Sequence, residues 1–254
     1  MYAQHFTCMT CFQEEGIPPE EFHLFPLNDD IAFIQECSKG HKNFVIYQTL
    51  KFELLFEIAT NALIDGYADA SCSRFAASLE RFYEFYTKAI LLYSGLSLDR
   101  IDEMWKPLKK LSERQYGAFS VAWEMDVINR RDNNIKIELP IKNRIGKMDF
   151  IQFRNEVIHN GYIPPLSETK EYAYIIYSFI EETLLYLKSQ YSKEVDILVQ
   201  QRWKQNHNNY KVSSICPPTI ISHVMRDTKF CKDFDEVISR AKEASRFGYS
   251  PKKS

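Results

Sequence analysis

The sequence predicts a mainly α-helical protein in which a small N-terminal module precedes a helical bundle. Apolar residues recur at helical spacing from about residue 49 onwards. The chain has 254 residues, 45% of them hydrophobic, so it can form one large core. Its first part is instead short, acidic and rich in cysteine. We therefore expect a module over residues 1–46, a bundle over 47–200 and a basic helical extension over 201–254.

The N-terminal module has too little apolar sequence to fold by burial alone. Residues 1–43 carry seven acidic and two basic side chains, and β-like runs lie around Phe22–Phe25 and Asn43–Tyr47. The module also holds three of the six cysteines of the chain. Small polar modules of this kind need an additional source of stability, and a bound metal ion is one such source.

Two short motifs in this module predict a metal site. Cys8 and Cys11 form a CxxC motif. Cys37 and His41 follow as Cys-x3-His, with Gly40 between them to ease the bend. Zinc favours four tetrahedral thiolate or imidazole ligands, so these motifs predict a structural zinc ion. The segment resembles a zinc ribbon or treble-clef knuckle, although the second pair of such knuckles is more often Cys-x2-Cys.

Other assignments of the cysteines and histidines stay open. His5 or His23 could supply the fourth ligand, or the three cysteines could be reduced thiols beside a surface histidine. A second site is disfavoured because its candidate ligands show no paired spacing. These candidates are His207, Cys216, His223 and Cys231, and we treat them as ordinary residues.

Two long helices are expected at the start of the bundle. The first carries an apolar stripe from Leu50 to Ala62 and stops at Gly66. The second covers about Ser71–Tyr93 and stops at Gly95. Because the link between them is short, the two helices should pack antiparallel.

The rest of the chain is expected to contain further helices. Helical pieces follow residue 96, with Pro107 and Gly117 as interruptions, and residues 132–140 resemble a connecting loop. A helix is expected over Lys147–Asn160, and Ser167 is a plausible N-cap for another that ends near Gln190. Residues 207–254 form a looser tail with one short amphipathic helix, "DFDEVISRAKEASRFG".

Charge and missing motifs narrow the functional classes. The net charge is −2, which gives no global sign of nucleic-acid binding. Residues 201–254 carry eleven basic and five acidic side chains, so this end could face phosphates or be ordinary solvated surface. No 18-residue apolar run and no signal peptide is present, so we expect a cytoplasmic protein without membrane contact. Walker-type, HExxH and GxSxG motifs are also missing.

One charged residue interrupts the apolar face of the helix expected over Lys147–Asn160. At about 100° per residue, Arg154 falls in the same arc as Phe150, Phe153 and Val157. A buried charge needs a partner or a wet cleft. An internal carboxylate, for which Glu80 is the best candidate, would make Arg154 a structural residue.

The stretch "RNEVIHNGYIPP", residues 154–165, resembles the signature of HEPN (higher eukaryotes and prokaryotes nucleotide-binding) domains. That signature is an Arg, commonly followed by a polar residue such as Asn, and a His after four to six intervening residues. Here Arg154, Asn155 and His159 match it, and the resemblance extends over about residues 49–191.

The resemblance implies a metal-independent ribonuclease that dimerises so that two such motifs line one cleft. His159 would assist proton transfer at the attacking 2′-hydroxyl or at the leaving oxygen. Arg154 would hold the scissile phosphate, Asn155 would orient it or a partner, and Glu80 would be a supporting carboxylate. The expected products carry a 2′,3′-cyclic phosphate and a 5′-hydroxyl.

Three functional hypotheses follow. The first is an HEPN-type endoribonuclease, acting as a toxin or defence effector, with RNA as its substrate and a homodimer as its assembly. The second is a non-catalytic HEPN-like module that binds nucleotide, RNA or a protein. The third is a protein adaptor whose N-terminal module docks a protein partner through aromatic residues such as Phe6 and Phe12.

Overall fold

The computed structural model describes most of the chain. The described residues are 2–16, 21–25, 29–129, 136–201, 209–215, 219–221 and 233–248. The chain divides into two compact units. The first comprises Met1–Leu50, Val199–Pro218 and Ser239–Ser254, and the second comprises Lys51–Leu198 and Thr219–Ile238. The fold is mainly α-helical, as expected. Within the described ranges, every helix is too short or too polar to cross a membrane.

The first unit is built around small sheets. Its elements are β1 (Tyr2–Phe6), α1 (Met9–Glu15), β2 (Glu21–Phe25), β3 (Ala32–Glu36), β4 (Lys42–Tyr47) and β7 (Lys211–Ile215). Strands β1 and β2 pair antiparallel, and a separate sheet has the order β3-β4-β7. Strands β2 and β4 coincide with the two β-like runs of the sequence.

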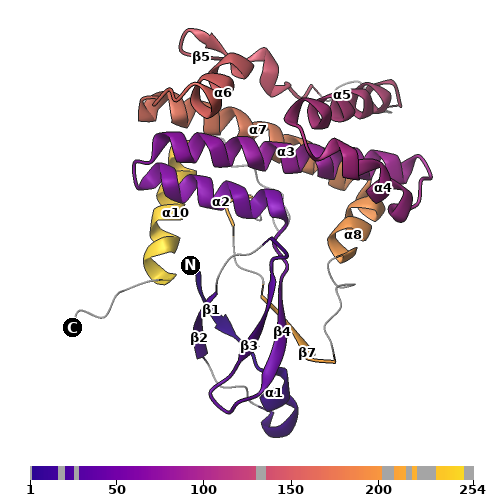
Figure 1. The fold of residues 1–254 in the computed structure, drawn as a ribbon, viewed down its shortest axis with the longest axis vertical. Helices are drawn as coiled ribbons and strands as arrows, with labels where there is room; N and C mark the ends of the chain where they lie inside the picture. Colours follow the sequence, from indigo (N-terminus) through magenta and orange to yellow (C-terminus); the bar gives the residue numbers. More distant parts are fainter. Residues whose placement is uncertain are drawn as a thin grey trace. The chain divides into compact units, whose positions relative to one another are not determined.

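Strand β7 comes from a part of the chain that was expected to form a separate helical extension. It pairs parallel with β4, so Val45 lies opposite Ser213 (Figure 1). The Ser213 hydroxyl donates to the carbonyl of Thr7 at 2.9 Å, and the Gln48 amide donates to the hydroxyl of Ser214 at the same distance. Residues 211–215 are therefore part of the sheet that also contains β3 and β4.

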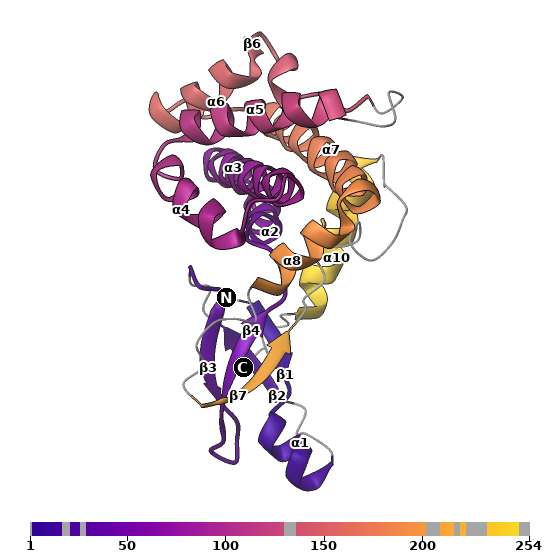
Figure 2. The same cartoon turned by 90° about the vertical axis from the view of Figure 1, so that its right-hand side faces the viewer.

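The second unit contains the long helices. Its elements, with two helices that reach past its borders, are α2 (Lys51–Ile64), α3 (Ala68–Tyr93), α4 (Leu98–Leu108), α5 (Ser112–Asn129), η1 (Pro140–Lys142), β5 (Arg144–Ile145), β6 (Met148–Asp149), α6 (Phe150–His159), α7 (Leu166–Gln190), α8 (Ser192–Gln200) and α10 (Phe234–Gly248). Figure 2 shows α3 in the middle of these helices, with α2, α5, α6 and α7 around it.

Helices α2 and α3 pack antiparallel, which confirms the expectation from their short link. The hydroxyl of Ser71 donates to the carbonyl of Ala59 at 2.8 Å, and Ser78 donates to Phe52 at 2.7 Å. Later residues of α3 thus meet earlier residues of α2. The link turns at Gly66, whose φ of 86° is a conformation that glycine adopts without steric cost.

Aromatic side chains from three helices fill the centre of this unit. Phe119 of α5 is fully buried, and its ring lies 4.3 Å from that of Tyr83 and 5.9 Å from that of Phe179. These residues belong to α5, α3 and α7, so one cluster joins helices that are distant in the sequence. Such edge and offset contacts add to the stabilisation from apolar burial.

The expected interruption at Gly117 is wrong, because Gly117 lies inside α5. Glycine costs about 1 kcal/mol relative to alanine in a helix interior. Burial of Phe119 and Trp123 on the same helix outweighs that cost. Pro107 lies in the last turn of α4, which ends one residue later at Leu108.

The expected starts of the next two helices are also corrected. Helix α6 begins at Phe150 and not at Lys147, because the Asp149 side chain caps it by accepting the N–H of Gln152 at 2.8 Å. Helix α7 begins at Leu166, so Ser167 lies within its first turn. Pro165 is the N-cap, and its carbonyl accepts the first helical hydrogen bond.

Candidate functional site

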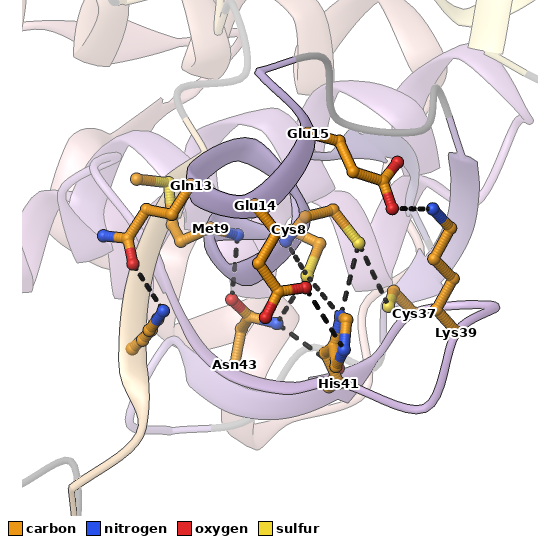
Figure 3. A network of polar contacts seen from close by, with 11 residues as sticks. Cys8, Met9, Gln13, Glu14, Glu15, Cys37, Lys39, His41 and Asn43 are labelled. Carbon is orange, nitrogen blue, oxygen red and sulfur yellow. Dashed lines mark hydrogen bonds and ion pairs between the residues drawn. The ribbon is translucent and has the colours of Figure 1, made fainter.

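Four side chains of the first unit converge on one point. Cys8 is the N-cap of α1 and Cys11 lies in its first turn, while Cys37 follows β3 and His41 precedes β4. The hairpin that connects Cys37 to His41 makes its turn at Gly40, which has a φ of 81°. Figure 3 shows Cys8, Cys37 and His41 facing one another. The three cysteines are buried and His41 is half-buried.

The distances within this cluster are compatible with a metal site. The sulfur of Cys11 lies 4.0 Å from that of Cys37 and 3.3 Å from Nδ1 of His41, and the Cys8 sulfur lies 3.9 Å from that nitrogen. All four ligand atoms lie within 4.8 Å of one another. A tetrahedral ion with thiolate and imidazole ligands places its ligands about 3.5–3.8 Å apart. The cluster could therefore hold a metal ion.

Asn43, which the sequence did not single out, holds the cluster in place. Its side chain is fully buried; it donates to the Cys8 sulfur at 3.3 Å and accepts the N–H of Met9 at 3.0 Å (Figure 3). Behind the imidazole, Glu14 lies 3.9 Å from Nε2 of His41. Contacts of this kind orient the ligands of metal sites, and here they leave Nδ1 of His41 facing the three sulfurs.

The protonation of two cluster thiols is perturbed in opposite directions. Burial raises the pKa of Cys8, but hydrogen bonds from the Cys11 backbone and the Asn43 amide outweigh it and lower this pKa to about 6. Burial and the neighbouring sulfurs of Cys8 and Cys37 raise the pKa of Cys11 to about 12. Crowded thiols thus resist ionising together unless a cation shares their charge.

The other candidate ligands belong to side chains or residues that the structure does not describe. The side chains of His5 and His23 lie outside the described side chains, although their backbone belongs to β1 and β2. The four residues of the disfavoured second site, His207, Cys216, His223 and Cys231, lie outside the described residues. Cys72, a described cysteine of α3, is buried in the helical core.

The second cluster surrounds the guanidinium of Arg154 on α6. Its Nη2 donates to Glu80 Oε1 of α3 at 3.0 Å and to Ser112 Oγ of α5 at 3.1 Å. Its Nη1 donates to Asn155 Oδ1 at 2.9 Å and lies 3.4 Å from Nε2 of His159. The guanidinium of Arg154 thus contacts the three other residues that the sequence predicted for catalysis, Glu80, Asn155 and His159.

The environment of this cluster lies between core and solvent. The apolar face of α6 buries Phe150, Phe153 and Val157. The Arg154 and Glu80 side chains keep 18% and 24% of their surface exposed, and His159 is exposed. Water and small solutes can therefore reach the imidazole while the guanidinium stays fixed by its partners.

The end of α6 sets the position of His159. The helix ends at His159 with Asn160 as its C-cap, and Gly161 takes the left-handed conformation with a φ of 71°. His159 is thus the last helical residue, on the turn that follows Arg154 and Asn155. Because a guanidinium only donates hydrogen bonds, its contact with Nε2 makes that nitrogen the acceptor.

Ser112 was missed by sequence reasoning, because a serine at a helix start looks like many others. It is the first residue of α5, and 42 residues separate it from Arg154.

No protein-family model, curated protein or solved structure matches the chain. Function is therefore inferred from the two side-chain clusters and from the resemblance of residues 154–165.

Proposed function

We propose that the chain is a metal-independent endoribonuclease of the HEPN type, acting through Arg154, Asn155 and His159. The observation that carries the proposal is the meeting of a fixed guanidinium and an exposed imidazole, 3.4 Å apart, at the end of α6. A phosphate binder beside a proton carrier is the minimal machinery for cleaving a phosphodiester with its own 2′-hydroxyl.

In this mechanism the 2′-oxygen of RNA attacks the adjacent phosphorus, and the bond from phosphorus to the 5′-oxygen breaks. One proton leaves the 2′-hydroxyl and one proton reaches the 5′-oxygen, which yields a 2′,3′-cyclic phosphate and a 5′-hydroxyl. His159 carries one of these two transfers. Arg154 donates to the phosphate oxygens as their negative charge builds up, and Asn155 orients the guanidinium or the phosphate.

Glu80 has a positioning role in this proposal. Its carboxylate holds Nη2 of Arg154, so Nη1 remains directed at Asn155 and His159. A side chain that is already held loses less conformational entropy when the phosphate binds. Glu80 therefore acts through Arg154 and does not itself need to touch the RNA.

The active assembly in this proposal is a homodimer with two motifs facing one cleft. Exposed apolar side chains near the motif support it: Ile163 in the loop after α6 and Leu166 at the start of α7 are 75% and 49% exposed. A second copy could cover them. Sedimentation of the protein should give a dimer, and Ile163→Lys should shift it towards the monomer.

The ion at the cysteine cluster is proposed to be zinc, in a structural role. Three thiolates and one imidazole are a ligand set that zinc prefers. Because the protein supplies all four ligands, no position remains for a catalytic water. The first unit would thus use zinc for stability, while RNA cleavage proceeds on the second unit.

An alternative function is a non-catalytic module that binds nucleotide, RNA or a protein. The ion pair between Arg154 and Glu80 favours this alternative, because it satisfies the guanidinium without any substrate. On this alternative, Arg154 and His159 would affect affinity or stability, but no cleavage products would form.

The deciding experiment is an RNA cleavage assay without added divalent metal and with EDTA, followed by measurement of retained zinc. Wild type should produce 2′,3′-cyclic phosphate ends, and His159→Ala should slow the reaction by roughly 100- to 10,000-fold. Gln152→Ala is the matched control, because Gln152 is an exposed residue of the same helix. Products that form equally fast with His159→Ala, or an RNA shift without products, would exclude the catalytic proposal.

A further inference from the structure

A pocket of about 210 Å³ opens beside Arg154 in the second unit. Arg154, Asn155, Glu80 and Ser112 form part of its wall, so it is continuous with the cluster described above. Ile151 of α6 also lines it and is 47% exposed, which places Ile151 at the mouth. Pockets for drug-sized ligands have volumes of about 300–1,000 Å³. This pocket is smaller, so it suits a single ring system.

Aromatic rings supply much of the rest of the wall. Tyr83 and Tyr116 line the pocket with ring centroids 5.8 Å apart. Phe150 and Tyr172 line it as a stacked pair with centroids 4.8 Å apart. The rings come from α3, α5, α6 and α7, so the pocket is held by the packing of the bundle. Walls of this kind favour a flat aromatic ligand.

Among the residues that line the pocket, Tyr172 has a buried hydroxyl without a hydrogen-bond partner. Tyr172 is 1% exposed, and its hydroxyl makes no hydrogen bond to any described residue. An unpaired buried hydroxyl costs roughly 1–3 kcal/mol, which a ligand that pairs with it would recover. Tyr172 can therefore add a hydrogen-bonding group to a wall that also carries the polar side chains of Glu80, Arg154 and Asn155.

The charges that line the pocket indicate which part of a ligand lies inside it and which part lies outside. Two carboxylates, Glu80 and Glu113, and one guanidinium, Arg154, line it. The carboxylates disfavour an anion inside the pocket. An anionic phosphate would instead contact Arg154 near the exposed His159, and a neutral ring with polar atoms would occupy the pocket.

We infer that this pocket binds one nucleobase of the RNA, next to the phosphate held by Arg154. The inference rests on the proposed function for the identity of the ligand. Aromatic walls give stacking, and Tyr172 gives a hydrogen bond that depends on the polar edge of the base. Cleavage is therefore expected to depend on the base beside the cut phosphate.

Binding of small probes tests the inference without requiring cleavage. The four ribonucleoside 3′-monophosphates and inorganic phosphate are titrated calorimetrically into the full chain. At least one nucleotide should bind more tightly than phosphate, and Tyr172→Phe should weaken that nucleotide by roughly 2- to 12-fold. Tyr172→Phe should not lower the unfolding temperature, because it removes an unpaired hydroxyl and leaves the ring.

Matched variants separate the pocket from the helix. Ile151→Trp should block the mouth and abolish the advantage of the nucleotide over phosphate. Two control variants should bind the nucleotide as wild type does. They are Gln152→Trp, at the next position of α6, which is exposed, and Tyr174→Phe, on α7 outside this pocket. Equal binding of nucleotide and phosphate, or equal effects of the pocket and control variants, would overturn the inference.

Cleavage of a random RNA pool then separates this inference from the proposed ribonuclease. Sequenced ends should show a preferred base in wild type that Ile151→Trp and Tyr172→Phe weaken. Cutting without any preference would refute the base pocket and keep the ribonuclease. Nucleotide binding that the pocket variants abolish, with RNA left intact, would refute the ribonuclease and keep the base pocket.

Discussion

Replacing Glu80 by Gln tests whether the carboxylate positions Arg154 for catalysis or only stabilises the bundle. The change keeps the shape of the side chain and one acceptor oxygen, but it removes the charge. In the structure, Glu80 Oε1 lies 3.0 Å from Nη2 of Arg154, and both side chains are about four-fifths buried.

The size of the effect follows from this distance and exposure. At about 3 Å and an effective dielectric constant of about 20, the gross attraction is roughly 5 kcal/mol, most of which desolvation offsets. Exposed pairs contribute up to about 1 kcal/mol, and loss of one partner of a buried pair costs about 3–5 kcal/mol. We therefore expect Glu80→Gln to lower the free energy of unfolding by about 1–3 kcal/mol.

Glu84→Gln is a close control for this change. Glu84 lies one turn later on α3, has a side-chain exposure of 21%, and pairs with Arg81 at 2.7 Å and Lys88 at 2.9 Å. Both variants are measured by urea unfolding and by the initial rate of RNA cleavage at a temperature where each is folded. Both should lose stability, but only Glu80→Gln should lose rate, by about tenfold.

A double-mutant cycle with Arg154→Lys completes the test. If Glu80 acts through Arg154, the rate effects of the two changes should couple by about 1 kcal/mol or more. Equal rate losses in Glu80→Gln and Glu84→Gln, or independent effects in the cycle, would refute the positioning role. Glu80 would then be a structural partner of Arg154 and nothing more.

Three further predictions concern stability and metal content. Asp126→Asn should lower the free energy of unfolding by about 2–5 kcal/mol in a urea titration, because a buried carboxylate that accepts from three phenols becomes a neutral amide; these phenols are Tyr86, Tyr186 and Tyr191. Burial raises the pKa of Glu181 from 4.5 to about 8, so its carboxyl favours the folded state below about pH 4.5 and this contribution is lost as the pH rises to about 8. Glu181→Gln should therefore gain on wild type by up to about 1.4 kcal/mol per pH unit in that window, and a pH-independent difference would contradict this. Cys11→Ser should lose stoichiometric zinc by elemental analysis, whereas the control Cys72→Ser should keep it, and equal zinc in both would exclude the cluster as its site.

Local sequence patterns predicted the helices well and their ends less well. The apolar period and Gly66 identified α2 and α3, because burial and a left-handed turn leave a signal in neighbouring residues. The predicted start of α6 was three residues too early, because the sequence alone does not show whether Asp149 is the N-cap or lies inside the helix. Gly117 was misread because the cost of one glycine is smaller than the gain from burying Phe119.

Contacts between residues that are distant in the sequence can be predicted only where the chemistry of one residue requires a particular kind of partner. The pairing of Arg154 with Glu80 was one of two alternatives that the sequence offered, because a charge in an apolar arc needs an opposite charge or a wet cleft. The cysteine cluster was anticipated in the same way, since metal ligands have recognisable spacing. Asn43 and Ser112 were missed, because their polar side chains have many acceptable partners and the sequence does not restrict the choice.

Strand β7 has a consequence for the order in which the protein matures. Strand β4 emerges early during synthesis, but its parallel neighbour is made more than 160 residues later. Until then one edge of β4 has unpaired backbone groups, which invite pairing with other chains. Helices α2 to α8 of the second unit are complete in the meantime, so they can fold first. Loading of the metal cluster should accordingly become stable only in a chain that has been synthesised past Ile215.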